Sequence, residues 1–412
     1  MINAKMALPL LTALACMPSQ ASAATLLGQN IQSLSVFSNT YATTGANSSV
    51  YGSLMTGDVG TSGAGGFISG SFTAVGAATI GGGASRVGGN ITAGGALTTG
   101  ASSSVGGNIT SGGAASVGAA GIIGGNIASA GAVSTGTAST IGGNVQSGGA
   151  ASIGVGGSVG GSVSAVGAYT QGAGSSVPAH QPIVTPPVDA AVLIASLTDT
   201  VAFNQLQLLA AQAAFSRMVT TTFLDATITA DTTLFSGVYS ADSLATTAST
   251  TITLDGQNKI DQFWVFNIAD ILTTGASSKI VMINGANSNS IIWNAGGYSA
   301  LGAGSTFLGT LISRANISVG ANAEALGAGL SCGGLFSALS YLSTGDGAKI
   351  GGEGCTGVGA GFEVNSDGVA YHIDSSEPTS AVPEPETWAM LMLGLGLVGT
   401  SMRRKSRAAV AA

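Results

Sequence analysis

The residues best suited to chemistry in this 412-residue chain are few and widely separated. Asp255, Asp261 and Asp270 are carboxylates of the kind that cleave polysaccharides, but that reaction needs clustered carboxylates or a base beside a cation. His180 and His372 lie far apart in the sequence, so no zinc-type ligand cluster is expected. The sequence therefore predicts no catalytic residue, no metal site and no cofactor, and it argues against an enzyme.

The glycine-rich middle of the chain also lacks the partners that its glycine motifs would need. Gly-Gly-x-Gly strings resemble calcium-binding repeats, but those repeats need an aspartate in each turn, and none occurs between Asp58 and Asp189. Glycine spacings of the dinucleotide-binding type are not followed here by a strand–helix unit and an acidic residue. With 66 glycines and only 7% charged residues, the composition excludes a basic nucleic-acid binder, a coiled coil and an acidic tail.

A repeat of eighteen residues fills that region. The phrase Val87-Gly-Gly-Asn90-Ile91 recurs from Val105, Ile123, Ile141 and Val159 without slippage. Each copy divides into three hexads that are apolar or small at positions one and five and usually glycine at position two. Six residues suit one short strand and one bend, and alternation along a strand should turn positions one, three and five inward. The pattern predicts a narrow triangular β-solenoid with 18-residue coils and a core of Val, Ile and Ala.

One polar position repeats with the coils, at Asn90, Asn108, Asn126 and Asn144. Stacked at about 4.7–4.8 Å, the side-chain amides could bond one another along the solenoid axis. We favour a structural ladder over a functional polar stripe.

A linker, a helix and a second set of strands follow the repeat. Residues 176–188 hold four prolines, Asp189 can cap a helix, and residues 190–218 lack Gly and Pro. Leu193, Leu197, Val201, Leu208 and Phe215 share one helical face, with a possible break at residues 198–200. The helix should cover one apolar side of the solenoid; a membrane-surface role is the alternative, which the scarcity of Lys and Arg disfavours. Apolar runs after residue 220 predict strands buried on both faces.

Both ends of the chain are predicted to be targeting signals. Residues 1–23 have one early cation, a short apolar run and a small-residue cleavage site, as in a secretory signal peptide. Near the C-terminus, Pro383-Glu384-Pro385 and Trp388 precede a short apolar run at residues 389–402 and a basic cluster that includes Arg403 and Arg404. This order resembles the PEP-CTERM sorting signal. The resemblance implies cleavage by an exosortase-type enzyme at the membrane and delivery to the surface or extracellular matrix of a Gram-negative bacterium.

The second strand set carries a further resemblance. Ser236-Gly-Val-Tyr239, Ile252-Thr-Leu-Asp-Gly256, Phe263-Trp-Val-Phe-Asn-Ile268 and Leu301-Gly-Ala-Gly-Ser-Thr-Phe-Leu-Gly-Thr310 are similar in order and spacing to the microbial ice-binding (antifreeze) family. The family implies a β-solenoid with a flanking helix. The resemblance covers residues 30–68 and 189–330, and the 18-residue repeats between them look like an insertion. It remains open whether the insertion preserves, extends or covers the usual ice face.

Ice binding needs a flat, rigid face of small hydroxyl and methyl groups. The outward Thr and Ser residues expected to supply it are Thr251, Thr253, Thr273, Ser278, Ser305, Thr310 and Ser318. A solvated Thr-rich surface without ice affinity is an equal alternative for each of them. In the insertion, the position after each apolar strand residue shows no regular Thr column. A structural or adhesive matrix protein that contacts polysaccharide is the alternative function, since the repeat makes a stiff rod.

Two cysteines, Cys332 and Cys355, lie in the exported part of the chain, where disulfides persist. We predict a bridge that ties a cap over the open edge of the last coil, with two free thiols as the alternative. A loop of this length favours folding by about 3 kcal/mol in the chain-entropy model.

The predicted domain organisation has eight segments. They are a signal peptide (1–23), N-terminal coils (24–68), the repeat insertion (69–176), a linker (177–188), the helix (189–219), C-terminal coils and cap (220–362), a tail (363–381) and the sorting signal (382–407).

Overall fold

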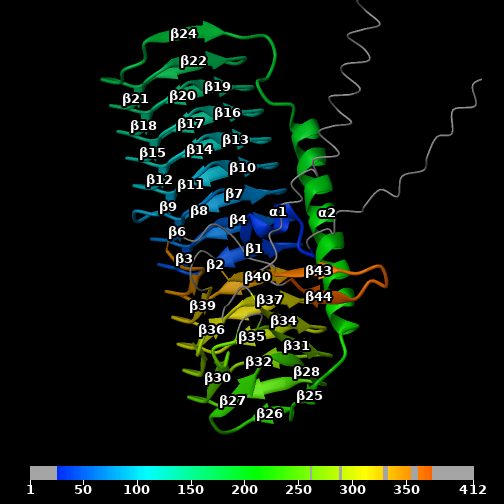
Figure 1. The fold of residues 1–412 in the computed structure, drawn as a ribbon. Helices are drawn as coiled ribbons and strands as arrows, with labels where there is room; N and C mark the ends of the chain where they lie inside the picture. Colours follow the sequence, from blue (N-terminus) through cyan, green and yellow to red (C-terminus); the bar gives the residue numbers. More distant parts are fainter. Residues whose placement is uncertain (1–25, 260–261, 287–289, 328–332, 354–360, 374–412) are drawn as a thin grey trace, which may run out of the picture. The chain divides into compact units, whose positions relative to one another are not determined.

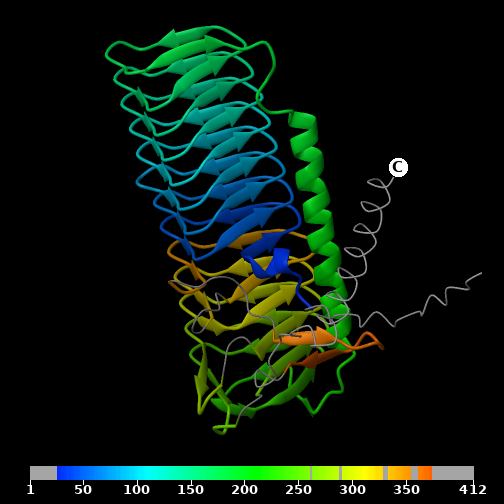
Figure 2. The same ribbon diagram turned by 45° about the horizontal axis from the view of Figure 1, so that its top comes forward.

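The computed structural model describes residues 26–259, 262–286, 290–327, 333–353 and 361–373. They form a β-solenoid whose coils stack one above another, with a long helix along one side (Figures 1 and 2). The predicted triangular solenoid with one flanking helix is confirmed. Contacts divide the chain into two units, Met1–His372 and Ile373–Ala412, and only Ile373 of the second is described.

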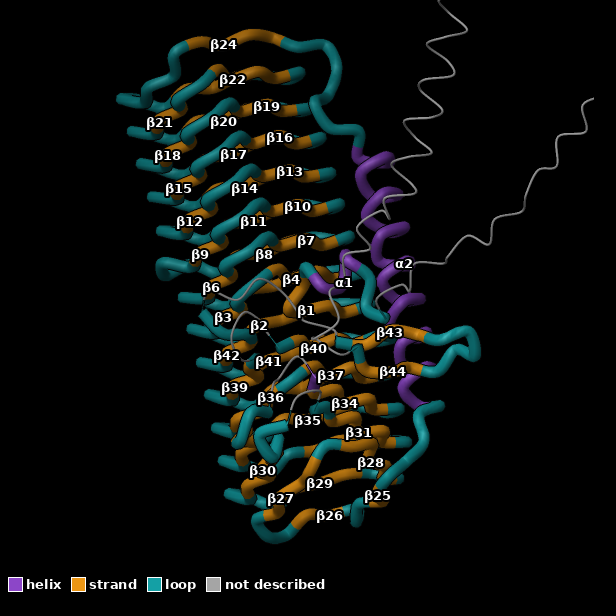
Figure 3. The backbone as a smooth tube through the Cα atoms, viewed as in Figure 1, coloured by secondary structure: helices purple, strands orange, loops and turns teal. Residues whose placement is uncertain are grey.

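Three parallel sheets make the three sides of the solenoid, as the strand colouring of Figure 3 shows. Sheet 1 has fifteen strands. In spatial order they are β24 (Ala179–Pro182), β22 (Ser162–Ala165), β19 (Val145–Ser147), β16 (Ile127–Ser129), β13 (Ile109–Ser111), β10 (Ile91–Ala93), β7 (Phe72–Ala74), β4 (Ser53–Thr56), β1 (Leu34–Ser38), β40 (Gly334–Ser337), β37 (Thr310–Ser313), β34 (Ile291–Ala295), β31 (Trp264–Ile268), β28 (Gly237–Ala241) and β25 (Thr222–Phe223).

Sheet 2 has fourteen strands. They are β23 (Tyr169–Gln171), β20 (Ala151–Ile153), β17 (Val133–Thr135), β14 (Ala115–Val117), β11 (Leu97–Thr99), β8 (Ala78–Ile80), β5 (Gly60–Ser62), β2 (Ala42–Thr44), β41 (Leu342–Thr344), β38 (Ile317–Val319), β35 (Ser299–Leu301), β32 (Leu272–Thr273), β29 (Leu244–Thr246) and β26 (Thr227–Ile228).

Sheet 3 has thirteen strands. They are β21 (Ser158–Val159), β18 (Thr140–Ile141), β15 (Ile122–Ile123), β12 (Ser104–Val105), β9 (Arg86–Val87), β6 (Phe67–Ile68), β3 (Ser49–Val50), β42 (Lys349–Ile350), β39 (Glu324–Leu326), β36 (Thr306–Leu308), β33 (Lys279–Ile283), β30 (Thr251–Asp255) and β27 (Thr232–Phe235).

The chain enters this stack in the middle, not at an end. β1 pairs with β4 above it and with β40 below it, so the first and last coils of the sequence are neighbours. The chain climbs through the repeat to β24, returns along the helix and rebuilds the stack from β25 upward (Figure 1). The expectation that the last coil has an open edge is therefore wrong, because β1, β2 and β3 cover β40, β41 and β42.

The solenoid core follows the hexads with one correction. In the coil that starts at Val105, Val105 and Ile109 are buried, but Gly107 at position three is not. Each strand has only two or three residues here, so the alternation does not run through the Gly-Gly bend that separates two strands. Positions one and five alone fill the core.

Helix α2 (Ala190–Ser216) follows Asp189, whose carboxylate accepts the N–H groups of Ala191 and Val192. No break occurs at residues 198–200; Thr198 and Thr200 donate their hydroxyls back to the carbonyls of Ile194 and Ser196. Only the lower part of the predicted face is buried, through Val201, Leu208 and Phe215. Its partners are apolar residues on the outer side of sheet 1: Phe37, Met55, Val238, Val265, Ile292, Ile312 and Phe336.

The proline-rich segment is not only a linker. Its residues Ala179–Pro182 form β24, which pairs with β22 and ends sheet 1. The ring of His180 stacks on that of Tyr169, with 4.2 Å between the centroids, above the top coil of the repeat. The prolines suit this place, because an edge strand needs no further N–H donors.

Two smaller elements lie beside α2. α1 (Gln29–Gln32) precedes β1, and a hairpin of β43 (Phe362–Val364) and β44 (Ala370–His372) packs against the foot of α2. The predicted signal peptide, Cys332, Cys355 and the sorting-signal residues lie outside the described residues. Their cleavage and pairing stay predictions, although the open edge that motivated the disulfide is absent.

Candidate functional site

The structure does not gather the seven predicted Thr and Ser residues on one face. Thr273 and Ser318 lie on the outer side of sheet 2, whereas Thr251 and Thr253 lie on sheet 3. All four are half-buried.

The other three predicted residues are buried, so their predicted outward orientation is wrong. Ser278 and Ser305 occupy the corner between sheets 2 and 3, where their hydroxyls donate to the carbonyls of Gly275 and Gly302, respectively. These bonds close the turn, as Ser103 does in the repeat by donating to Gly100. Thr310 begins β37 on sheet 1 and is only 1% exposed.

Sheet 2 instead presents an unbroken outer column of small residues. The middle residue of each three-residue strand points outward and lies in register with the next coil. From the bottom coil to the top the column reads Thr227, Ala245, Thr273, Ala300, Ser318, Ser343, Thr43, Thr61, Thr79, Thr98, Ser116, Ser134, Ser152 and Thr170. At about 4.8 Å between strands, fourteen strands span about 60 Å. We call this column, with the two that flank it, the sheet 2 face.

A second column is formed by the residue two positions before the middle one, just ahead of each strand. It differs between the two halves of the solenoid. In the repeat every member is alanine: Ala77, Ala96, Ala114, Ala132, Ala150 and Ala168, stacked by coil-to-coil backbone hydrogen bonds at 2.8–2.9 Å. In the lower coils the same column holds larger groups, among them Tyr298, Tyr341 and Tyr41. Tyr41 and Tyr341 stack with their centroids 4.7 Å apart.

Glycine forms the third column, two residues after the middle one, from Gly275 upward; the two lowest coils have Thr229 and Thr247 there. A Cβ at Gly118 would lie 2.4–2.6 Å from the backbone of Gly100 and Ala101 in the coil below. The coils are therefore too close at this line for any side chain. The line itself stays low, and in the repeat, where alanine forms the neighbouring column, the sheet 2 face is flat.

The other two sides of the solenoid are less suited to a uniform contact. Sheet 3 carries Arg86, Lys279, Lys349 and Glu324 among its outward positions. Lys349 Nζ donates to Glu324 Oε1 at 2.9 Å, and this hydrogen bond raises the pKa of Lys349. Sheet 1 is covered by α2 along its lower coils.

The asparagine ladder lies at the corner between sheets 3 and 1, away from the sheet 2 face. Its bonds differ from the expected chain of amide–amide contacts. Asn90, Asn108 and Asn126 each accept, through Oδ1, the backbone N–H of the Asn one coil above at 2.8 Å. A side-chain amide contact appears between Asn126 Nδ2 and Asn108 Oδ1 at 3.1 Å. The ladder joins backbones of successive coils, which fits a structural role.

Sequence reasoning missed the insertion's part of the column because it followed the wrong strand of each coil. The position after Ile91, which runs through Thr92 to Ser164, lies on sheet 1. The regular hydroxyls lie six residues further on, at Thr98, Ser116 and Ser134. A test of every outward position at the 18-residue period would have found them.

Comparisons with known proteins found similarity for part of these coils. A family model described as ice-binding-like matches residues 144–337, and a PEP-CTERM protein-sorting motif matches residues 381–405. Ice-binding protein 1 of Shewanella frigidimarina strain NCIMB 400 is 38% identical over 93 residues. That match covers 22% of this chain and 10% of the relative, so the chain spans about a tenth of the relative's length.

Solved structures of ice-binding proteins are similar to most of the chain, at low identity. The ice-binding protein of the Antarctic ascomycete Antarctomyces psychrotrophicus gives a TM-score of 0.40 at 15% identity, covering 80% of this chain and 98% of that one. The domain of S. frigidimarina ice-binding protein 1 gives 0.40 at 16%, covering 80% and 96%. Residues 144–337 of this chain are therefore similar to the ice-binding-like family, and residues 381–405 match a PEP-CTERM protein-sorting motif, which indicates export and membrane-anchored sorting in a Gram-negative bacterium.

Proposed function

We propose that the protein binds ice through the sheet 2 face, and that the insertion extends this face. The observation that carries the proposal is the unbroken column of fourteen Thr, Ser and Ala residues in register. None of its members is charged, and among the residues that the structure describes neither a helix nor a charged column covers it.

The physical argument concerns water held on a rigid surface. Methyl groups cannot hydrogen-bond water, so water beside them bonds chiefly to itself, while a hydroxyl row anchors that layer at regular points. In the repeat, columns of alanine methyls and of Thr or Ser hydroxyls run side by side at the coil spacing. The fixed backbone holds the array in place before ice arrives, so binding costs little conformational entropy.

One coil supplies a matched test. Ser134 lies on the sheet 2 face and Thr140 on sheet 3, six residues apart, and both are exposed. Ser134→Tyr should lower thermal hysteresis and ice-recrystallisation inhibition several-fold, because the ring stands above the plane. Thr140→Tyr should leave both unchanged. Equal effects of the two substitutions, or no activity in the unsubstituted protein, would refute the proposal.

The alternative is a structural or adhesive matrix protein that contacts polysaccharide without binding ice. The observation that favours it is the stack of the exposed Tyr41 on the half-buried Tyr341, because aromatic rings commonly line sugar-binding surfaces. Retention on purified biofilm matrix that falls on Tyr41→Ala, in a protein inactive toward ice, would establish it.

Delivery follows from the sorting motif. We infer that a signal peptide of residues 1–23 exports the chain, that an exosortase-type enzyme processes the motif, and that the product acts at the cell surface or in the matrix. Mass spectrometry of the secreted protein should find Ala24 as its first residue; retention of residues 1–23 would contradict this.

A further inference from the structure

Helix α2 is apolar on the side that faces away from the solenoid. Within Ala190–Ser216 the only charged side chain is that of Asp199. We call the exposed positions that recur every three or four residues, together with Phe203, the outer stripe. They are Val192, Ala195, Asp199, Ala202, Phe203, Leu206, Ala210 and Ala213. Three large members, Val192, Phe203 and Leu206, are 64%, 50% and 65% exposed.

A helix that covers a soluble protein normally has a polar outer side. By length and composition α2 could even cross a membrane. It cannot do so in this fold, because Val201, Leu208 and Phe215 are packed on sheet 1. The outer stripe is therefore left to a partner that meets α2 sideways.

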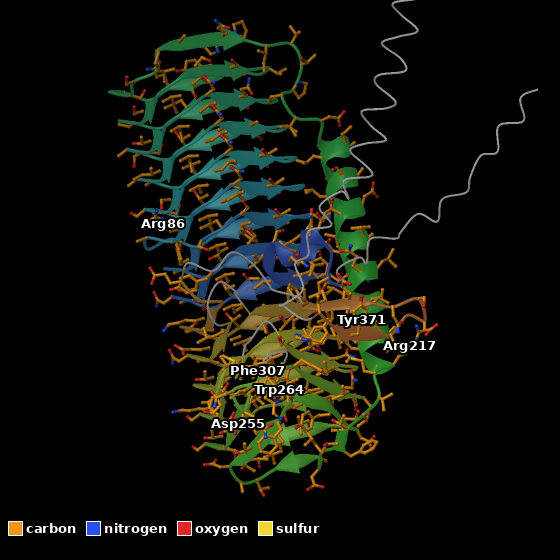
Figure 4. The ribbon with its side chains drawn as sticks, in the orientation of Figure 1. Arg86, Arg217, Asp255, Trp264, Phe307 and Tyr371 are labelled. Carbon is orange, nitrogen blue, oxygen red and sulfur yellow. The ribbon has the colours of Figure 1, made fainter. Side chains whose placement is uncertain are left out.

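Both membrane-directed ends of the chain join the solenoid beside the foot of α2. Leu26 N–H donates to Phe362 O at 3.0 Å, which places the start of the described chain on β43. The ring of Phe362 meets Phe215 of α2 edge-on at 5.2 Å, and Arg217 Nη1 donates to Gly368 O at 3.2 Å. β44 ends at His372, after which the chain continues towards the sorting motif at residues 381–405. Figure 4 shows Arg217 and Tyr371 together at this place, far from Arg86.

We propose that the outer stripe of α2 rests on a lipid bilayer while the protein is membrane-anchored. Because the described chain ends beside α2 on its way to the sorting motif, the anchored protein approaches the bilayer with that side. α2 is about 40 Å long and can lie along the surface with its apolar stripe toward the acyl chains. Sheet 2 then faces away from the membrane, and the candidate ice surface stays free.

The chemistry of the stripe specifies the kind of lipid contact. The helix has no Lys or Arg, and the exported part of the chain carries a net charge of about −10. Anionic headgroups would repel such a protein, so the contact is apolar and needs no anionic lipid. It should persist at high salt.

The test uses the full chain reconstituted in phosphatidylcholine vesicles, with and without brominated acyl chains as a quencher. Trp264 and Trp293 are 0% and 1% exposed, and Trp388→Phe removes the tryptophan of the sorting segment. In that background, Leu206→Trp reports on the outer stripe and Ser134→Trp on the sheet 2 face. Circular dichroism checks that both variants keep the fold.

Brominated lipid should quench Leu206→Trp at least twofold more than Ser134→Trp, equally in low and high salt. Equal quenching at both positions would overturn the proposal. The proposal would also be overturned if the fluorescence of Leu206→Trp did not respond to lipid but changed with protein concentration. That result would assign the outer stripe to a second copy of the chain. Dependence on anionic lipid would overturn the apolar mode of contact.

Discussion

The repeat coils and the C-terminal coils build the same solenoid from different interiors. The C-terminal coils hold Trp264, Phe266, Trp293 and Phe307 inside, with Phe266 and Trp293 stacked at 3.8 Å between centroids. Figure 4 labels Trp264 and Phe307 in these coils. The repeat coils hold Val, Ile, Leu or Ala at most inward strand positions, and small hydroxyl residues such as Thr99 and Ser111 at the others. Because the strands stay in register across β1 and β40, the outer column of sheet 2 continues through both halves.

The two halves are also held together differently on the outside. Over the C-terminal coils the apolar outer side of sheet 1 is covered by α2, whereas Thr92 and Thr110 occupy that side in the repeat. The repeat adds an asparagine ladder and close glycine contacts between coils. The surface column therefore depends on coil geometry, not on how the core is filled.

The largest effect should come from breaking the repeat register. Deleting residues 105–113, half a coil, moves the following strands onto the wrong sheet and should abolish cooperative folding. Deleting residues 105–122, one whole coil, lets β9 meet β15 with every face preserved, so folding should survive. Thermal melting followed by circular dichroism distinguishes the two deletions. Equal loss of folding in both would contradict the claim that the repeat is a stack of interchangeable coils.

Smaller losses of stability are expected from single substitutions in the core of each half, and their sizes compare the two cores. Trp293→Ala removes the stack on Phe266 and the hydrogen bond from Nε1 to Leu308 O at 2.9 Å, and should cost about 3–5 kcal/mol. Ile127→Ala in the repeat should cost about 2–3 kcal/mol, because the buried side chain that is removed is smaller. The free energies of unfolding come from urea titration. If Ile127→Ala lowers the free energy of unfolding more than Trp293→Ala does, the expected order of the two cores is wrong.

The smallest effect should come from the ladder. Asn126→Ala removes the acceptor for the Asn144 N–H and the donor to Asn108, and should cost about 1 kcal/mol. Asn126→Ser should recover part of this loss, since Ser71 accepts the N–H of Asn90 at the same place in an earlier coil. Urea titration again measures both, and a neutral Asn126→Ala would leave the ladder without a structural role.

Much of the fold could be predicted because its signals are local and periodic. The 18-residue period means that each residue of one coil has an equivalent at the same corner or strand of the next coil, which predicts the solenoid. The absence of Gly and Pro after Asp189 indicates a helix. The family resemblance, carried by segments such as Phe263–Ile268, is confirmed by the ice-binding-like match over residues 144–337. Ser278 and Ser305 were misplaced because a hydroxyl that closes a turn has the same sequence appearance as one that faces water. Thr310 was misplaced because it begins a strand of sheet 1 and is buried there.

The sequence by itself determined the coil, the helix and the sorting motif, since each depends on neighbours within one period or one segment. Only the tertiary structure decided that β1 stacks on β40, because nothing in the chain marks a contact between strands about 300 residues apart. That contact makes one face from two regions of sequence. It brings Thr43 beside Ser343, so that hydroxyls supplied by the N-terminal, repeat and C-terminal coils form one continuous column.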